Sequence, residues 1–202
     1  MPDVLSLPDR RAWIFDLDGT LTQPVHDFLH IRQELGIAPD QDILATIAAR
    51  PSSEREEMMV RLDELEHLYA ARAKPAPGVL ELLEFLAVNR CDMGILTRNT
   101  QSIAIASLAA IGAEHFFIHD RIIGRDEARP KPDTQGITLL LNSWQRMPDE
   151  AVMVGDFRYD LETGRAAGTF TIHVDDRDRH WPELTDLRVS SLQALTHHLK
   201  NA

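Results

Sequence analysis

The chain has 202 residues, with 21 Lys and Arg against 32 Asp and Glu, which gives a formal net charge of −11. This length can bury the core of one domain with a modest insertion, and a composition of 44% hydrophobic and 26% charged residues is ordinary for a globular protein. Because DNA and anionic lipid repel an acidic chain, neither nucleic acid nor a membrane is expected as a partner.

The sequence gives no sign of disulfide, zinc or export chemistry. The single cysteine, Cys91, cannot form an internal disulfide, and no Cys/His spacing typical of a zinc site is present. The first residues do not form an apolar secretory stretch, and no window reaches the roughly 18 to 20 apolar residues of a membrane helix. We therefore expect a cytoplasmic protein.

The first predicted element is a short buried strand. Residues 12–15 are all apolar, and the run stops at Asp16. Such a run is typical of a strand that is covered on both faces. The strand is therefore expected to carry an acidic residue to its C-terminal end, where residues 18–20 turn the chain.

A helical region follows. Between residue 26 and about residue 73, apolar residues recur at spacings of three and four, which predicts three or four helices. Ser53 and Glu56 have the spacing of a capping box at the start of one of them. A proline-rich hinge, residues 74–78, is expected to close the segment.

After the hinge, apolar strands alternate with amphipathic helices. We predict strands at residues 93–97, 115–119, 151–154 and 169–174, and helices at residues 79–89, 101–111, 133–144, 159–167 and 191–199. Strands that alternate with helices form a parallel sheet with helices on both faces. The predicted fold is therefore α/β, a doubly wound parallel sheet with an α-helical insertion after its first strand.

Four polar motifs lie at or just beyond the predicted strand ends, where ligands of a doubly wound sheet bind. They are Asp16-Leu17-Asp18-Gly19-Thr20, Thr97-Arg98-Asn99, Arg129-Pro130-Lys131-Pro132, and Gly155-Asp156 followed by Asp160. Carboxylates gathered there would raise each other's pKa values unless a cation lay between them, and hard oxygen ligands suit Mg²⁺. Lys131, Thr97 and Asn99 would supply positive charge and donors to a second anion. A phosphate fits between such donors and the metal.

Together these motifs resemble the four-motif signature of the haloacid dehalogenase superfamily. The helical insertion between the first and second motifs is similar to its small-cap subfamily, which contains phosphoglycolate phosphatase and β-phosphoglucomutase. The resemblance covers nearly the whole chain. It implies a Rossmann-like core domain of residues 1–22 and 76–202 and a small α-helical cap domain of residues 23–75.

The resemblance also implies the catalytic and metal-binding residues. Asp16 would be the nucleophile that forms an aspartyl-phosphate, and Asp18 the general acid and base. Asp16, Asp18 and Asp156 would hold the cofactor, Mg²⁺, with Asp18 contributing its main-chain carbonyl.

The remaining motif residues would bind phosphate or support the site. Thr97, Asn99 and Lys131 would contact the phosphoryl oxygens, and the rigid prolines beside Lys131 suit a lysine that must be aimed. The supporting residues would be Gly19, Thr20 and Asp160, with Asp160 holding either a metal-bound water or Lys131.

Several of these residues have a purely structural alternative. Asn99 or Thr100 could cap the next helix, and Asp160 could be a helix N-terminal charge that the dipole favours. Arg98 could point into solvent rather than contact the substrate.

The expected function is Mg²⁺-dependent hydrolysis of a small soluble phosphate monoester, of the phosphoglycolate or sugar-phosphate type, through an aspartyl-phosphate. The presence of Asp18 disfavours a dehalogenase, and Lys74 is the only lysine of the insertion, which disfavours Schiff-base chemistry in the cap. A phosphomutase of the β-phosphoglucomutase type and a non-catalytic phosphate-binding or scaffold protein are the alternatives. The expected partner is a small-molecule phosphate ester, and the chain is expected to be a monomer or homodimer.

Overall fold

The computed structural model describes residues 6–24, 27–177 and 179–201. Within these residues, six parallel strands form one sheet in the order β3-β2-β1-β4-β5-β6. The strands are β1 (Ala12–Phe15), β2 (Asp92–Leu96), β3 (Ile122–Ile123), β4 (Ala151–Gly155), β5 (Phe170–Val174) and β6 (Leu187–Val189). The chain runs outward from β1 to β3 and then returns to the other side of β1, so the topological switch point lies between β1 and β4. The predicted doubly wound α/β fold is confirmed.

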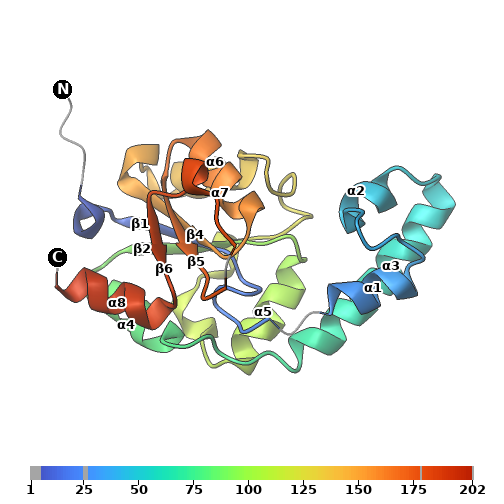
Figure 1. Cartoon of the computed structure of the whole chain (residues 1–202), viewed down its shortest axis with the longest axis horizontal. Helices are drawn as coiled ribbons and strands as arrows, with labels where there is room; N and C mark the ends of the chain where they lie inside the picture. The colour runs from blue at the N-terminus through green and yellow to red at the C-terminus, as the bar shows by residue number, and fades with distance from the viewer. Residues whose placement is uncertain (1–5, 25–26, 178, 202) are drawn as a thin grey trace.

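Helices cover both faces of the sheet, which explains why its central strands are apolar throughout (Figure 1). Trp13 and Phe15 of β1 pack into one cluster, and Ala12 and Ile14 pack into the other, as the alternation of side chains along a strand requires. The first cluster includes residues of α4 (Val79–Val88), α5 (Gln101–Ala110) and α8 (Leu192–Lys200). The second cluster includes residues of α6 (Gln135–Trp144). Helix α7 (Arg158–Ala167) packs on β4 and β5.

Three further helices lie between β1 and β2 in the sequence and project to one side of the sheet (Figure 1). They are α1 (Phe28–Glu34), α2 (Ile43–Ala48) and α3 (Ser52–Ala70). Their buried side chains form a cluster separate from the two clusters of the sheet. This separation supports the proposed division into a core, residues 1–22 and 76–202, and a cap, residues 23–75. None of the helices in the described part of the chain combines the length and the apolar character that a membrane crossing requires.

The strand predicted at residues 115–119 is wrong. The structure has two 3-10 turns, Glu114–Phe116 and His119–Arg121, and the strand β3 begins only at Ile122. In the predicted segment Phe117 is buried but Ile118 is 68% exposed. The apolar run therefore reflects one anchoring side chain in a turn and not a covered strand.

The capping box predicted at Ser53 and Glu56 is also wrong. Pro51 is the N-cap of α3, with φ −55°, and no side chain caps this end. Pro51 has an extended ψ of 154°, so the helix starts at the next residue, Ser52, and Ser53 lies inside its first turn. The short edge strand β6 was not predicted, because its three residues, Leu-Arg-Val, are too few for an alternating pattern to be recognised.

Gly78 stands at the end of the hinge and begins α4 with φ +83°. A Cβ at this position would lie 2.4 Å from the backbone nitrogen of Gln193. We predict that Gly78→Ala lowers the free energy of unfolding by more than Gly36→Ala, as measured by urea denaturation. Gly36 has a similar φ, +63°, but a Cβ there would meet no atom of the described residues within 4 Å. Gly36→Ala should therefore lower the free energy of unfolding only by the backbone strain, about 1–2 kcal/mol. Equal losses in the two variants would contradict this account.

Candidate active site

The structure brings the four predicted motifs together at the carboxyl edge of the sheet. Asp16 directly follows β1, Thr97 follows β2, and Asp156 follows β4. Lys131, from the loop after β3, contacts both the first motif at Asp16 and the fourth motif at Asp160. The second motif joins the first, since Asn99 Nδ2 lies 2.6 Å from Asp18 Oδ2.

Lys131 is buried between two carboxylates. Its Nζ donates to Asp16 Oδ1 and to Asp160 Oδ1, each at 2.6 Å, and only 2% of its side chain is exposed. Burial lowers the pKa of Lys131, but the charges of Asp16 and Asp160 outweigh burial and raise this pKa above its ordinary value. Burial, together with the charge of Asp160, raises the pKa of Asp16 well above 3.8, and Lys131 opposes that rise. Lys131 therefore stays charged at neutral pH.

Asp160 combines the two roles considered for it. Its Oδ1 accepts from Lys131, and its Oδ2 accepts from the backbone nitrogen of Phe157 at 3.0 Å, at the first turn of α7. A Cβ on Gly155 would lie 2.2 Å from the Asp160 Cβ. Glycine at position 155 therefore allows the helix to bring Asp160 to Lys131.

Asp156 approaches the turn of the first motif. A Cβ on Gly19, which has φ +91°, would lie 2.7 Å from Asp156 Oδ2, so only glycine leaves room for this carboxylate. Arg179 Nη2 donates to the same oxygen at 3.0 Å and to Asp175 Oδ1 at 2.8 Å. Burial, together with the charge of Asp160, raises the pKa of Asp156 to about 6, against the opposing effect of Arg179.

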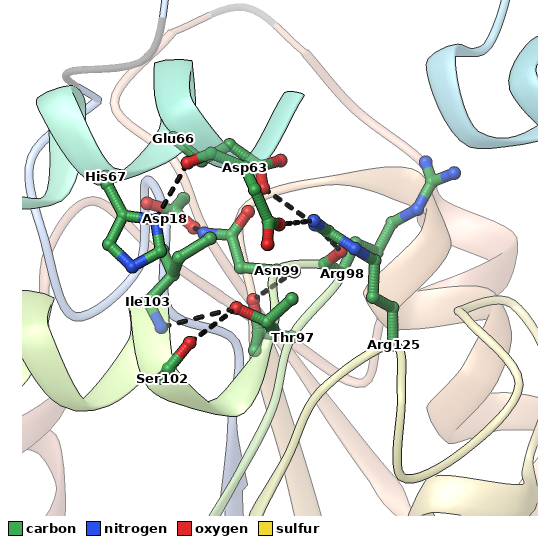
Figure 2. A network of polar contacts seen from close by, with 11 residues as sticks. Asp18, Asp63, Glu66, His67, Thr97, Arg98, Asn99, Ser102, Ile103 and Arg125 are labelled. Atoms are coloured by element: carbon green, nitrogen blue, oxygen red, sulfur yellow. Dashed lines mark hydrogen bonds and ion pairs between the residues drawn. The ribbon is translucent and has the colours of Figure 1, made fainter. Parts of the chain in front are cut away.

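The second motif lies in the loop after β2, and hydrogen bonds within this loop orient its side chains (Figure 2). Thr97 is buried, and its Oγ1 accepts from the backbone nitrogen of Asn99 at 3.1 Å. Thr100 is the N-cap of α5 and accepts from the nitrogen of Ile103, so the capping role falls to Thr100. The amide of Asn99 is directed instead toward Asp18. Thr20, in the turn of the first motif, is fully buried.

Two arginines connect this loop region to the cap. Arg98 points to the cap and not to solvent: it binds Asp42 at the N-terminus of α2. Arg125, from the loop after β3, binds Asp63 and Glu66 of α3 (Figure 2). A cavity of about 580 Å³ lies between core and cap and is lined by the motif carboxylates, Lys131, Arg98 and cap residues.

Sequence reasoning did not assign Arg125 or Arg179. Arg125 binds carboxylates of α3 that are distant in the sequence. Arg179 binds the distant Asp156 and also Asp175, which lies in the same charged loop. No spacing pattern in the sequence indicates these ion pairs. The one signal that could have found them was their place in loops that follow strands β3 and β5, at the same edge as the four motifs.

The donor set at this edge fits a divalent cation. Oxygens of Asp16, Asp156 and Asp160 lie within 4.8 Å of one another. The three clustered carboxylates contact two cationic side chains: Lys131 binds Asp16 and Asp160, and Arg179 binds Asp156. Hard oxygen donors of this kind suit Mg²⁺.

Comparison with known proteins gives a consistent result. The family model described as haloacid dehalogenase-like hydrolase matches residues 13–174. A haloacid dehalogenase-like hydrolase domain-containing protein of Arabidopsis thaliana is 30% identical, over 91% of this chain and 77% of its own length. An N-acetylmuramic acid 6-phosphate phosphatase of Pseudomonas aeruginosa is 27% identical, over 85% of this chain and 87% of its own.

A solved structure shares the fold. A hydrolase from Pseudomonas syringae superposes with a TM-score of 0.81 at 20% identity, covering 95% of this chain and 99% of that one. At this level of identity the likeness concerns the fold.

The central position of Lys131 leads to a stability prediction. Lys131→Met leaves Asp16 and Asp160 buried without their cation, and we expect the free energy of unfolding at pH 8 to fall by roughly 3–5 kcal/mol. Because the pKa of Lys131 is raised in the folded state, its stabilising contribution is present throughout the range below 10.5. The deficit should shrink at pH 5, because burial raises the pKa of Asp16 and this carboxylate can then take up a proton.

The matched control is Lys200→Met. Lys200 Nζ lies 2.8 Å from Glu81 Oε1, but both side chains are about half exposed, so its loss should cost no more than about 1 kcal/mol. Denaturant unfolding of both variants at the two pH values measures the difference. Similar losses in the two variants would show that Lys131 has no special part in the stability of the site.

Proposed function

Because the chain belongs to the haloacid dehalogenase-like hydrolase family, we propose that it is a phosphatase that hydrolyses a small soluble phosphate monoester, of the phosphoglycolate or sugar-phosphate type, with Mg²⁺ as cofactor. The observation that carries this proposal is the contact of Lys131 with Asp16 and Asp160 beside Thr97 and Asp18. This contact supports a site in which Asp16 would be the nucleophile, Asp18 the acid and Lys131 the anion-binding cation of one cavity. The P. aeruginosa relative, named as a phosphatase of a phosphorylated sugar acid, supports the same class of reaction.

In the proposed reaction Asp16 acts as the nucleophile. Lys131 holds its Oδ1, and the other carboxylate oxygen attacks phosphorus. A bond forms between this oxygen and phosphorus, while the ester oxygen leaves with the electron pair of the broken bond and takes a proton from Asp18. Water then attacks the aspartyl-phosphate, and Asp18 takes its proton, so that inorganic phosphate and the free Asp16 carboxylate result.

The second motif would position both the acid and the phosphate. The amide of Asn99 binds Asp18 Oδ2 and so orients its carboxyl group. Since Thr97 Oγ1 already accepts from the nitrogen of Asn99, the hydroxyl proton is available to a phosphoryl oxygen. Lys131 adds the positive charge that stabilises the transferring phosphoryl group.

Asp16 and Asp156 would hold the Mg²⁺ together with the main chain of Asp18. Both oxygens of Asp160 are engaged by Lys131 and by the nitrogen of Phe157, which suits a supporting role for Asp160. When bound, the cation supplies charge neutralisation at the phosphoryl oxygens.

We predict that Asp16→Asn abolishes phosphate release, because an amide oxygen is too weak a nucleophile to form the acyl phosphate. The measurement is phosphate release from p-nitrophenyl phosphate and a panel of metabolite monoesters with Mg²⁺. The control is Asp120→Asn, the same change at an exposed position, which should retain full activity. Unchanged activity in Asp16→Asn would contradict the proposal, and an isomerised, still phosphorylated product would indicate a mutase.

We predict that Mg²⁺ raises the melting temperature of the wild type. A ligand at 100 times its Kd stabilises the folded state by about 2.7 kcal/mol. The shift should be larger at pH 7.5 than at pH 5.5, because protonation of Asp156, whose pKa is about 6, competes with the metal. Asp156→Asn should lose most of the shift and Asp120→Asn none. An equal shift in all three proteins would argue against a metal site at Asp156.

A further inference from the structure

One wall of the cavity is formed by the cap. Asp42, the N-cap of α2, lines this wall together with Arg32, and the core residue Arg98 reaches the same place. Arg98 lies between Thr97 and Asn99 in the chain, so the segment proposed to bind the phosphate also carries a cation to the cap. Because Lys131, Arg98 and Asp42 line one cavity, a substrate whose phosphate lies at Lys131 and whose remainder extends toward the cap would meet Asp42 and Arg98.

Asp42 and Arg98 form a paired, partly buried contact. Arg98 Nη2 lies 2.8 Å from Asp42 Oδ1, and Nη1 lies 2.8 Å from Oδ2. The side chains are 28% and 25% exposed, and the guanidinium lies over the Tyr159 ring at 4.9 Å from its centroid. A two-point pair of this kind is geometrically specific. The positive charge of Arg98 is thereby neutralised at the wall that the substrate faces.

Arg32 places a second guanidinium near the same carboxylate. Its Nε and Nη1 donate to the backbone oxygens of Gln41 and Phe28. Burial raises the pKa of Asp42, but the hydrogen bonds from Arg98 and from the nitrogen of Ala45, with the charges of Arg98 and Arg32, outweigh burial and lower this pKa. Asp42 is thus an ionised carboxylate between two cations. Asp40 lines the same wall but is exposed.

Resting on the proposed phosphatase function, we propose that Asp42 determines substrate specificity by neutralising Arg98 at the cap wall. The site then takes phosphate monoesters whose remainder is uncharged and bears hydroxyl groups, such as a neutral sugar phosphate. A second anionic group on the substrate would meet the Asp42 carboxylate. Arg98 is held by Asp42, and Arg32 is held by two backbone oxygens, so neither guanidinium is directed to receive the anion. Of the two classes of monoester named above, this favours the sugar-phosphate type over one that carries a carboxylate.

The test compares glucose 6-phosphate with 6-phosphogluconate, which has similar size but a distal carboxylate. Binding is measured by calorimetry in an Asp16→Asn background, with and without Asp42→Asn. Asparagine retains the acceptor that caps α2 through the nitrogen of Ala45, so the substitution removes the charge and preserves the helix. We expect the parent to bind glucose 6-phosphate more tightly. The added Asp42→Asn should shift the ratio of the two Kd values toward 6-phosphogluconate by roughly tenfold.

Asp27→Asn is the matched control, since Asp27 caps α1 in the same way through the nitrogen of His30 but does not line the cavity. It should leave the ratio unchanged. The shift caused by Asp42→Asn should also shrink with added salt, which a purely structural effect would not do.

An unchanged Kd ratio in Asp42→Asn would overturn the inference. If that unchanged ratio came with an equal loss of affinity for both esters, the pair would only hold the cap in place. A parent that binds 6-phosphogluconate more tightly would overturn it as well. Because the binding ratio needs no turnover, these results are distinct from a failure of the phosphatase proposal, which would appear as an absence of phosphate release from every monoester.

Discussion

The site depends on one buried interaction, the contact of the Lys131 ammonium with Asp16 and Asp160. Removing three charged groups from water is costly, and the cost is offset only where each charge meets its partner at short range. The two contacts of 2.6 Å meet this condition. They also tie together three separate parts of the chain: the end of β1, the loop after β3 and the first turn of α7. The position of the candidate nucleophile is therefore set by charge pairing as well as by the sheet.

The sheet order makes this pairing possible. Asp16 and Asp156 follow β1 and β4, which are neighbours at the switch point, although 140 positions separate the two residues in the sequence. Two glycines then allow the close approach of the loops: Gly19 leaves room for the Asp156 carboxylate, and Gly155 leaves room for Asp160. The fold thus brings the acidic residues near one another, and the lack of a Cβ at Gly19 and Gly155 leaves room for their carboxylates.

Much of the architecture could be predicted from the sequence because it rests on local patterns. Apolar runs predicted β1, β2, β4 and β5 to within a residue or two, and motif spacing singled out Asp160 and Lys131, which the structure shows in direct contact. The strand predicted at residues 115–119 was wrong, because a turn that buries one phenylalanine, Phe117, has the apolar composition of a strand. The edge strand β6 was too short to be predicted.

The core–cap contacts could not be predicted in this way. Arg98 with Asp42, and Arg125 with Asp63 and Glu66, pair residues 56 to 62 positions apart. Arginines and carboxylates are common on solvated helix faces, and their periodicity does not reveal which of them meet across a cavity. The partners follow only from where the sheet edge places the loops after β2 and β3 relative to the cap.

The charged character of these contacts bears on how the cap could move. An apolar interface loses its full burial free energy when it is exposed to water, whereas an ion pair that separates regains the hydration of both charges. The side chains of Arg98 and Asp42 are already partly exposed, whereas those of Arg125 and Glu66 are buried, with Glu66 at the wall of the cavity. Opening of the cap would therefore exchange ion pairs for hydrated charges at modest cost, while the apolar clusters of cap and core stay intact. A site that must admit a phosphate ester and then exclude water is well served by such an interface.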